Sequence, residues 1–169
     1  AGNVSIDGGT IKLDGNYPTG TDNVALGDTA LDSVAADGNF NVAIGNKALT
    51  ANTTGDLNNA VGCGALDANT TGSFNVGIGG NALGSKTTHN SNTAVGQGSN
   101  GGADGGASST SIGASSLAVN TASENTAVGA CALNANTSGT NNVGVGYQSL
   151  DSNTTGDKNT ALGTGALAA

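Results

Sequence analysis

The chain has 169 residues and a net charge of −8, with four lysines and no arginine. A balance this acidic offers no cationic face for phosphates, which excludes nucleic acid as a partner and argues against binding to an anionic membrane surface. No stretch reaches the roughly 18 apolar residues of a membrane-spanning helix, so we expect no membrane insertion.

Residues 1–22 precede the repeated part of the chain. Here Val4 to Leu13 alternate loosely around an Asp-Gly-Gly turn, which predicts a short hairpin or a capping strand. We therefore expect residues 1–22 to be an N-terminal cap or connecting hairpin, and residues 23–169 to be one repeat domain. Because the last repeat stops midway at Ala169, we expect this domain to be a fragment of a longer chain.

From Asn23 onward, one short unit recurs nine times. Its glycines are 16 to 18 residues apart, most often 17, at positions 27, 45, 62, 79, 96, 113, 129, 146 and 163. A period of this length is too short for two helices and fits one coil of a β-solenoid. The predicted fold class is therefore all-β: a parallel β-solenoid or β-roll of about nine 17-residue coils, about 43 Å long at roughly 4.8 Å per coil.

Two aliphatic columns run through the repeat, and we predict both to be structural core columns. In the predicted strand, the aliphatic column shares a face with the residue two positions earlier, and a small Ala, Gly or Ser between them forms the opposite face. Which face lines the coil's own interior and which faces a partner is left open by the sequence. The columns are Leu26, Ile44, Val61, Ile78, Val95, Ile112, Val128, Val145 and Leu162 before the glycine, and Leu31, Leu49, Leu66, Leu83, Leu117, Leu133 and Leu150 after it.

Asparagine and threonine dominate the turns of the repeat. The Asn that opens most units either stacks into a hydrogen-bonded ladder or makes a turn, and both interpretations remain open. A threonine column gives a candidate surface-binding row of Thr53, Thr70, Thr87, Thr121, Thr137 and Thr154. Residues 97–108 depart from the repeat, which predicts loose packing in either a degenerate copy or a bend or ligand loop.

The sequence contains no constellation typical of catalysis. The hexapeptide pattern of left-handed helix acyltransferases fails, because the next aliphatic residue that it requires is absent. His89 is the only histidine, and the carboxylates are scattered through turns without a calcium-loop spacing. Cys63 and Cys131 are about 19 Å apart in a solenoid, too far for a disulfide. We therefore expect no enzyme, no catalytic, cofactor-binding or metal-binding residue, and no cofactor.

Each unit has few large apolar side chains, which predicts chains that share a core in a homotrimer. The motifs Asn-Val-Ala-Ile-Gly at 41–45 and Asn-Thr-Ala-Val-Gly at 92–96 resemble the head repeats of trimeric autotransporter adhesins. The longer unit, with Ala-Leu-x-x-Asn-Thr-Thr-Gly, is more similar to fibre proteins of tailed phages, especially marine ones.

The resemblance implies a left-handed β-roll with three chains side by side, on a virion or cell surface, that positions a receptor-binding tip. The chain's partners would then be further copies of itself and a host glycan or protein. The alternatives are an ice-binding β-solenoid that uses the threonine rows, or a monomeric extracellular adhesin.

Overall fold

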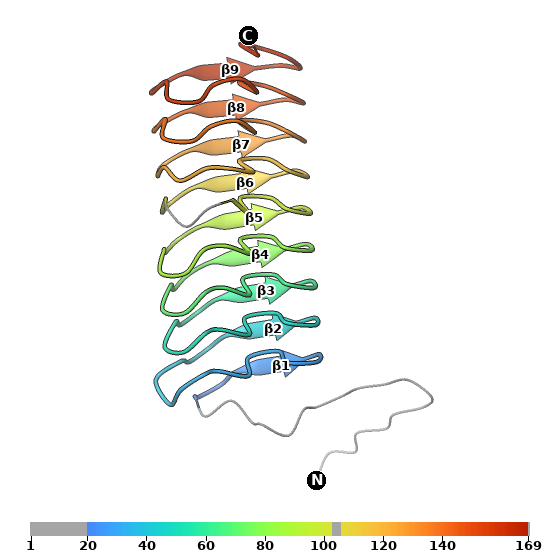
Figure 1. The fold of residues 1–169 in the computed structure, drawn as a ribbon, viewed down its shortest axis with the longest axis vertical. Coiled ribbons are helices and arrows are strands. Elements are labelled where there is room, and N and C mark those ends of the chain that lie inside the picture. Colours follow the sequence, from blue (N-terminus) through green and yellow to red (C-terminus); the bar gives the residue numbers. More distant parts are fainter. Residues whose placement is uncertain (1–19, 103–105, 169) are drawn as a thin grey trace, which may run out of the picture.

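The computed structural model describes residues 20–102 and 106–168, which form a rod of stacked coils (Figure 1). Nine parallel strands follow one another in chain order along the rod, linked by about eight turns. The predicted all-β parallel β-solenoid is confirmed. The cap expected over residues 1–22 lies almost entirely outside the described residues. The strands are β1 (Val24–Leu26), β2 (Val42–Ile44), β3 (Asn59–Val61), β4 (Val76–Ile78), β5 (Thr93–Val95), β6 (Thr110–Ile112), β7 (Thr126–Val128), β8 (Val143–Val145) and β9 (Thr160–Leu162).

The repeat sets the register of the sheet, because each strand residue pairs with its counterpart one coil later. Ala43, for example, lies beside Ala60. The N–H of Val42 donates to the carbonyl of Asn58 in the next coil at 2.8 Å, and the N–H of Gly62 donates to the carbonyl of Ile44 in the preceding coil at 2.8 Å. Bonds in both directions along the axis tie each coil to its two neighbours.

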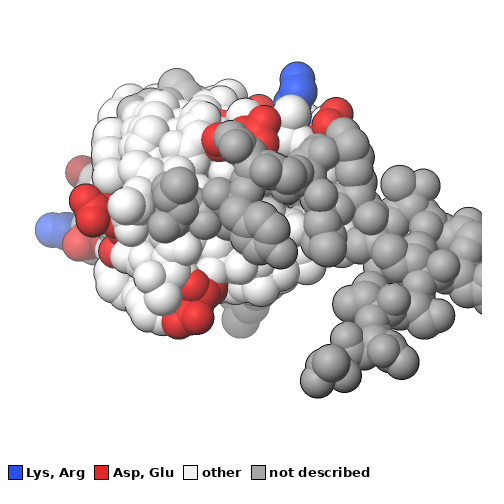
Figure 2. All heavy atoms as spheres, turned by 90° about the horizontal axis from the view of Figure 1, so that it is seen from below, with Lys and Arg blue, Asp and Glu red and all other residues white. Residues whose placement is uncertain are grey.

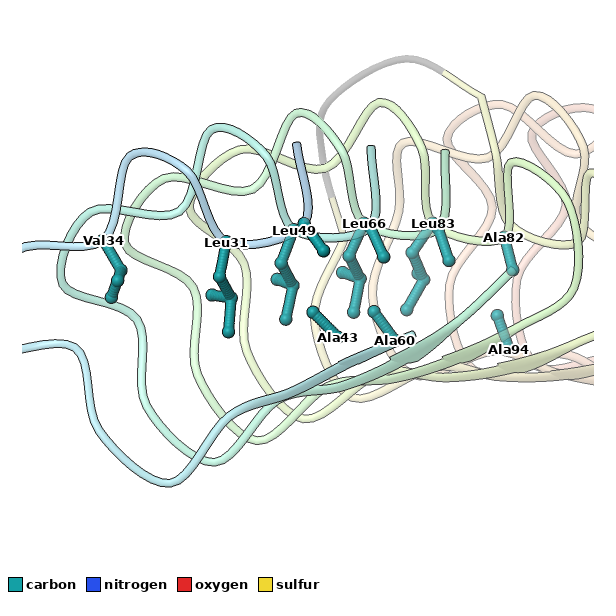
Figure 3. Packing of buried hydrophobic residues seen from close by; sticks show 12 residues of the cluster. Leu31, Val34, Ala43, Leu49, Ala60, Leu66, Ala82, Leu83 and Ala94 are labelled. Carbon is teal, nitrogen blue, oxygen red and sulfur yellow. The ribbon is translucent and has the colours of Figure 1, made fainter. Parts of the chain in front are cut away.

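The interior of the rod is a thin layer between the sheet and the turns that face it. Leucines such as Leu49 and Leu66 point from the turns toward strand residues such as Ala43 and Ala60 (Figure 3), and all four are fully buried. The space is tight, since even a Cβ added at Gly77 would stand 3.1 Å from the backbone oxygen of Ala82 in the facing turn. The middle strand residues are accordingly Ala25, Ala43, Ala60, Gly77, Ala94, Ser111, Ala127, Gly144 and Ala161.

Two separate constraints, backbone conformation and close packing, require glycine after each strand from β1 to β8. Gly62 has a φ of 134°, a region that L side chains rarely adopt, and a Cβ there would lie 2.7 Å from the carbonyl group of Gly79 in the next coil. The coils therefore stack backbone against backbone at this corner, and any side chain would push them apart.

Buried asparagines form the ladder that the sequence left open. Asn58 is fully buried, and its Oδ1 accepts from the backbone N–H of Asn75 at 3.0 Å and from Nδ2 of Asn75 at 3.1 Å. Its own Nδ2 donates to the carbonyl of Gly72 at 2.8 Å. The ladder interpretation is therefore confirmed, and the same asparagines also close the turn between one coil and the next.

A second ladder, which the sequence analysis did not identify, runs through the asparagines of the Asn-Thr turns. Nδ2 of Asn69 donates to Oδ1 of Asn52 at 2.8 Å, and Nδ2 of Asn136 donates to Oδ1 of Asn120 at 2.8 Å. In the coil of β4 the column holds Lys86, which is fully buried and whose Nζ donates to the carbonyl of Asn120, two coils on, at 2.9 Å. Lys86 thus spans the coil of β5, which lacks this asparagine.

The sequence of the coil of β5 departs furthest from the repeat. Ser99 and Asn100 are fully buried, yet Oγ of Ser99 and both Nδ2 and Oδ1 of Asn100 have no hydrogen-bond partner. Asn100 stands in the leucine column, between Leu83 and Leu117 of the adjoining coils. Buried polar atoms without partners are destabilising, so this coil is the weak one in hydrogen bonding. The loose packing predicted for residues 97–108 stays a prediction.

Candidate functional site: the outer face of the sheet

The outer face of the sheet, made by the first and third residues of each strand, is the candidate interaction surface. We expected its third-residue column, Leu26 to Leu162, to be a core column, but in the single chain six of its nine side chains are half-buried and Ile78, Ile112 and Leu162 are exposed. Ile78 is 42 % exposed and Ile112 is 41 % exposed. The reason is the thin interior described above, which admits only Ala, Gly or Ser and so turns the larger residues outward.

The other predicted core column, the leucines after the repeat glycine, lies in the interior of the rod as predicted. Leu31, Leu49, Leu66, Leu83, Leu117, Leu133 and Leu150 are at most 3 % exposed and line the interior. These leucines adopt a left-handed backbone, with φ between 49° and 54°. That conformation costs roughly 1–2 kcal/mol for an L residue, whereas burying a leucine contributes about 1.5–3 kcal/mol. Burial therefore outweighs the backbone cost at each turn.

The outer face carries no charged residue in any of the nine strands. Its third column is aliphatic throughout, and its first column is aliphatic in four strands, threonine in four and asparagine in β3. Most of these side chains are half-exposed or exposed. The result is a periodic surface of branched apolar side chains that the chain does not cover with any part of its described residues.

An apolar ridge, formed by Phe40, Leu57 and Phe74, extends this face along one edge. The three residues occupy the same position of successive coils, just before the ladder asparagine, and are 51, 44 and 58 % exposed. All three have a left-handed backbone, with φ of 57°, 57° and 62°. The sequence analysis missed the ridge, although a column alignment of the repeat would have shown the three large residues one coil apart.

The threonine row lies in the Asn-Thr turns, next to the first ladder, since Asn41 and Asn52 both donate to the carbonyl of Gly55, and it is bonded within the rod. Oγ1 of Thr53 donates to the carbonyl of Thr70 at 2.9 Å, and Oγ1 of Thr137 donates to the carbonyl of Thr154 at 3.0 Å. Thr70 and Thr121 bond in the same way. Because these hydroxyl hydrogens are already donated to the next coil, the row that we predicted as a surface-binding site presents mainly methyl groups. The row comprises Thr53, Thr70, Thr87, Thr121, Thr137 and Thr154, which are partly exposed or exposed.

The negative charge of the molecule lies outside the outer face. Seen along the axis, the acidic side chains gather in separate patches around the perimeter, with uncharged surface between them (Figure 2). Some of them serve the fold. Oδ1 of Asp157 accepts from the backbone N–H of Thr140 at 2.6 Å, and these bonds to Thr140 lower the pKa of the Asp157 carboxyl. Burial raises the pKa of Asp67.

The part of the chain that the structure describes brings together no set of three His, Cys, Asp or Glu side chains that could hold a metal ion. Cys63 and Cys131 are unbridged, and His89 sits at a turn position that other coils give to glycine. A shallow polar groove lies at the last coil, between Leu150 and Leu167. Within residues 20–102 and 106–168 we find no helix able to cross a membrane.

Compared with protein-family models, with curated proteins and with solved structures, the chain gives no match.

Proposed function

We propose that this chain is a stiff shaft segment of a fibre on a virion or cell surface, in which three copies pack side by side. Its role is mechanical. It positions the part of the fibre that attaches to a host glycan or protein, or it contributes to that attachment. The resemblance to adhesin head repeats and phage fibre repeats supports the trimer and the extracellular setting. No catalytic step is part of the proposal.

The outer face of the sheet is the observation that carries the proposal. An isolated rod leaves two columns of mostly branched, uncharged side chains in water along its whole length. Contiguous apolar surface of this kind marks a contact with another macromolecule. Because the surface repeats with every coil, it matches a partner that repeats in the same way, and further copies of the chain have that property.

The hydrogen bonds along the axis support the mechanical role. Each coil is joined to the next by backbone bonds at the strand and at the turns, and by the asparagine ladders. Bending the rod would strain many of these bonds together. A segment that saturates its backbone in this way suits a spacer better than it suits a mobile binding loop.

The mass of the chain in solution, measured by light scattering on a sizing column, tests the proposal. One chain weighs 15.9 kDa, so three weigh three times that, about 48 kDa. We expect the larger mass, unchanged by tenfold dilution. A compact species of 15.9 kDa would refute the shared-fibre proposal and would favour a single-chain adhesin or an ice-binding protein.

A further inference from the structure

We infer that the copies meet chiefly through the apolar ridge and the adjoining outer face of β2, β3 and β4, and that the occupant of this surface is a second copy of the chain. The inference rests on the proposed function and deepens it, because it assigns the contact to one third of the rod. The remaining outer face, in β1 and from β5 to β9, contributes less to association.

The polarity of the outer face changes along the rod. In chain order, the ridge residue and the two outward strand residues are Phe40, Val42 and Ile44 in the coil of β2, Leu57, Asn59 and Val61 in the coil of β3, and Phe74, Val76 and Ile78 in the coil of β4. From β5 onward the ridge position holds Ser91, Ser108, Glu124, Asn141 and Lys158, and the first strand position is threonine in β5, β6, β7 and β9. At the ridge position, large apolar side chains thus occur in three consecutive coils only, and the coil of β1 holds Asp22 there.

The turn itself does not require an aromatic residue at the ridge. Ser91, Ser108 and Asn141 adopt the same left-handed backbone as Phe40 and Phe74, with φ between 56° and 61°. The N–H groups of Ser91 and Ser108 also bond to the preceding coil, as in the bond from Ser91 to the carbonyl of Ser73 at 3.1 Å. Since the two phenylalanines are about half exposed, they do not fill the interior either. The left-handed turn therefore accepts a serine as well as a phenylalanine at this position.

Charge and symmetry identify the occupant as another copy. Chains of net charge −8 repel one another, so they can approach only through a face without carboxylates, and the ridge and outer face of β2, β3 and β4 have none. In a three-fold assembly whose axis runs along the rods, the copies are parallel and equivalent coils stand at the same height. The apolar coils then face one another, whereas Glu124 faces Glu124 and Lys158 faces Lys158 further along the rod.

Matched variants of the full chain test this assignment. Phe40→Ser with Phe74→Ser places at the ridge the residue that Ser91 and Ser108 already provide in the same turn. Leu57→Lys places at the ridge the residue that Lys158 provides in the coil of β9. In a parallel assembly the new lysines of neighbouring copies would face and repel one another. Asn141→Ser, in the same column of the coil of β8, is the control. Light scattering gives the mass over a dilution series, and circular dichroism of each variant reports whether the strands persist.

We expect both ridge variants to associate at least about tenfold more weakly than the wild type, with unchanged strand signal, and the control to keep the wild-type mass. A wild-type monomer would overturn the proposed function and this inference together. A wild-type assembly that both ridge variants retain would overturn this inference alone. Strand loss in the serine variant, with an intact and fully assembled Leu57→Lys variant, would also overturn it, because the ridge would then support the fold and not the contact.

Discussion

Replacing Asn100 by leucine should stabilise the rod. Asn100 occupies the leucine column of the coil of β5, and its φ of 44° is close to the 54° of Leu83 and the 49° of Leu117. The backbone therefore already has the conformation that buried leucines adopt in this molecule. The asparagine is fully buried, and neither Nδ2 nor Oδ1 has a hydrogen-bond partner.

The size of the effect follows from three contributions. Removing an unsatisfied buried polar group gains about 1–3 kcal/mol. Burying a leucine contributes about 1.5–3 kcal/mol relative to leaving it in water. Fitting a larger side chain into an existing space costs about 1–3 kcal/mol. We therefore expect Asn100→Leu to raise the free energy of unfolding by about 2 kcal/mol.

Urea unfolding at a fixed protein concentration, followed by far-ultraviolet circular dichroism, measures this change. Leu83→Asn, the reverse exchange in the adjoining coil, is the matched control and should be destabilising by a larger amount. A free energy of unfolding that stays the same or falls in Asn100→Leu would refute the reasoning, since it would mean that the Asn100 amide is satisfied in solution.

Three further predictions concern the ladder, the stacking corner and one carboxylate. Asn58→Ala leaves the buried N–H of Asn75 without its acceptor and should lower the free energy of unfolding by about 2–4 kcal/mol. Asn58→Ser should cost about half of that, because a serine hydroxyl accepts the equivalent bond at Ser109. Equal urea midpoints for the wild type and the two variants would contradict the ladder. Gly62→Ala should cost more than about 3 kcal/mol, since its Cβ would lie 2.7 Å from Gly79, and a melting temperature close to that of the wild type would contradict the stacking. Burial raises the pKa of Asp67 above its unfolded value, so its ionised form is destabilising at neutral pH. Asp67→Asn should therefore melt higher there, and the difference should shrink as the pH falls below the folded-state pKa and vanish below the unfolded-state pKa. A difference that persists in acid would exclude this cause.

The repeat alone was enough to predict the solenoid, the buried leucine column and the asparagine ladder as one of two alternatives. These features follow from spacing: residues 17 apart lie side by side in neighbouring coils, so identical residues must stack. The interior could not be assigned from the sequence in the same way. Period-2 alternation separates Val42 and Ile44 from Ala43, but it does not say which side is inside.

That choice depends on the turn that faces the sheet. Leu49 has a left-handed backbone, which leucine disfavours, so sequence propensity gives no warning of it. In this conformation the leucine fills the space above Ala43, and the strand must present its small residue inward. The thin interior then exposes the larger strand residues, and this exposure is the source of the candidate interaction face.

The ridge and the second ladder were missed for a different reason. Phe40 and Phe74 are separated in the sequence by two full coils, and only a residue-by-residue alignment of the columns places Leu57 between them. Lys86 breaks the pattern of the second ladder in the coil of β4, so that its asparagines read as separate turn residues. Their hydrogen bonds from coil to coil became apparent only when the coils were stacked.

Hydroxyl-radical footprinting of the assembled protein would test most directly whether the outer face is covered by other copies. Phe40 and Phe74 are 51 and 58 % exposed in the single chain. The reference is Tyr147, which is 52 % exposed and lies in the turn after β8, outside the strands and the ridge. Each reaction rate is to be divided by that of the same residue in the urea-unfolded chain. We expect Phe40 and Phe74 to be protected several-fold more strongly than Tyr147. Equal protection of the three rings would contradict a contact between copies at this face.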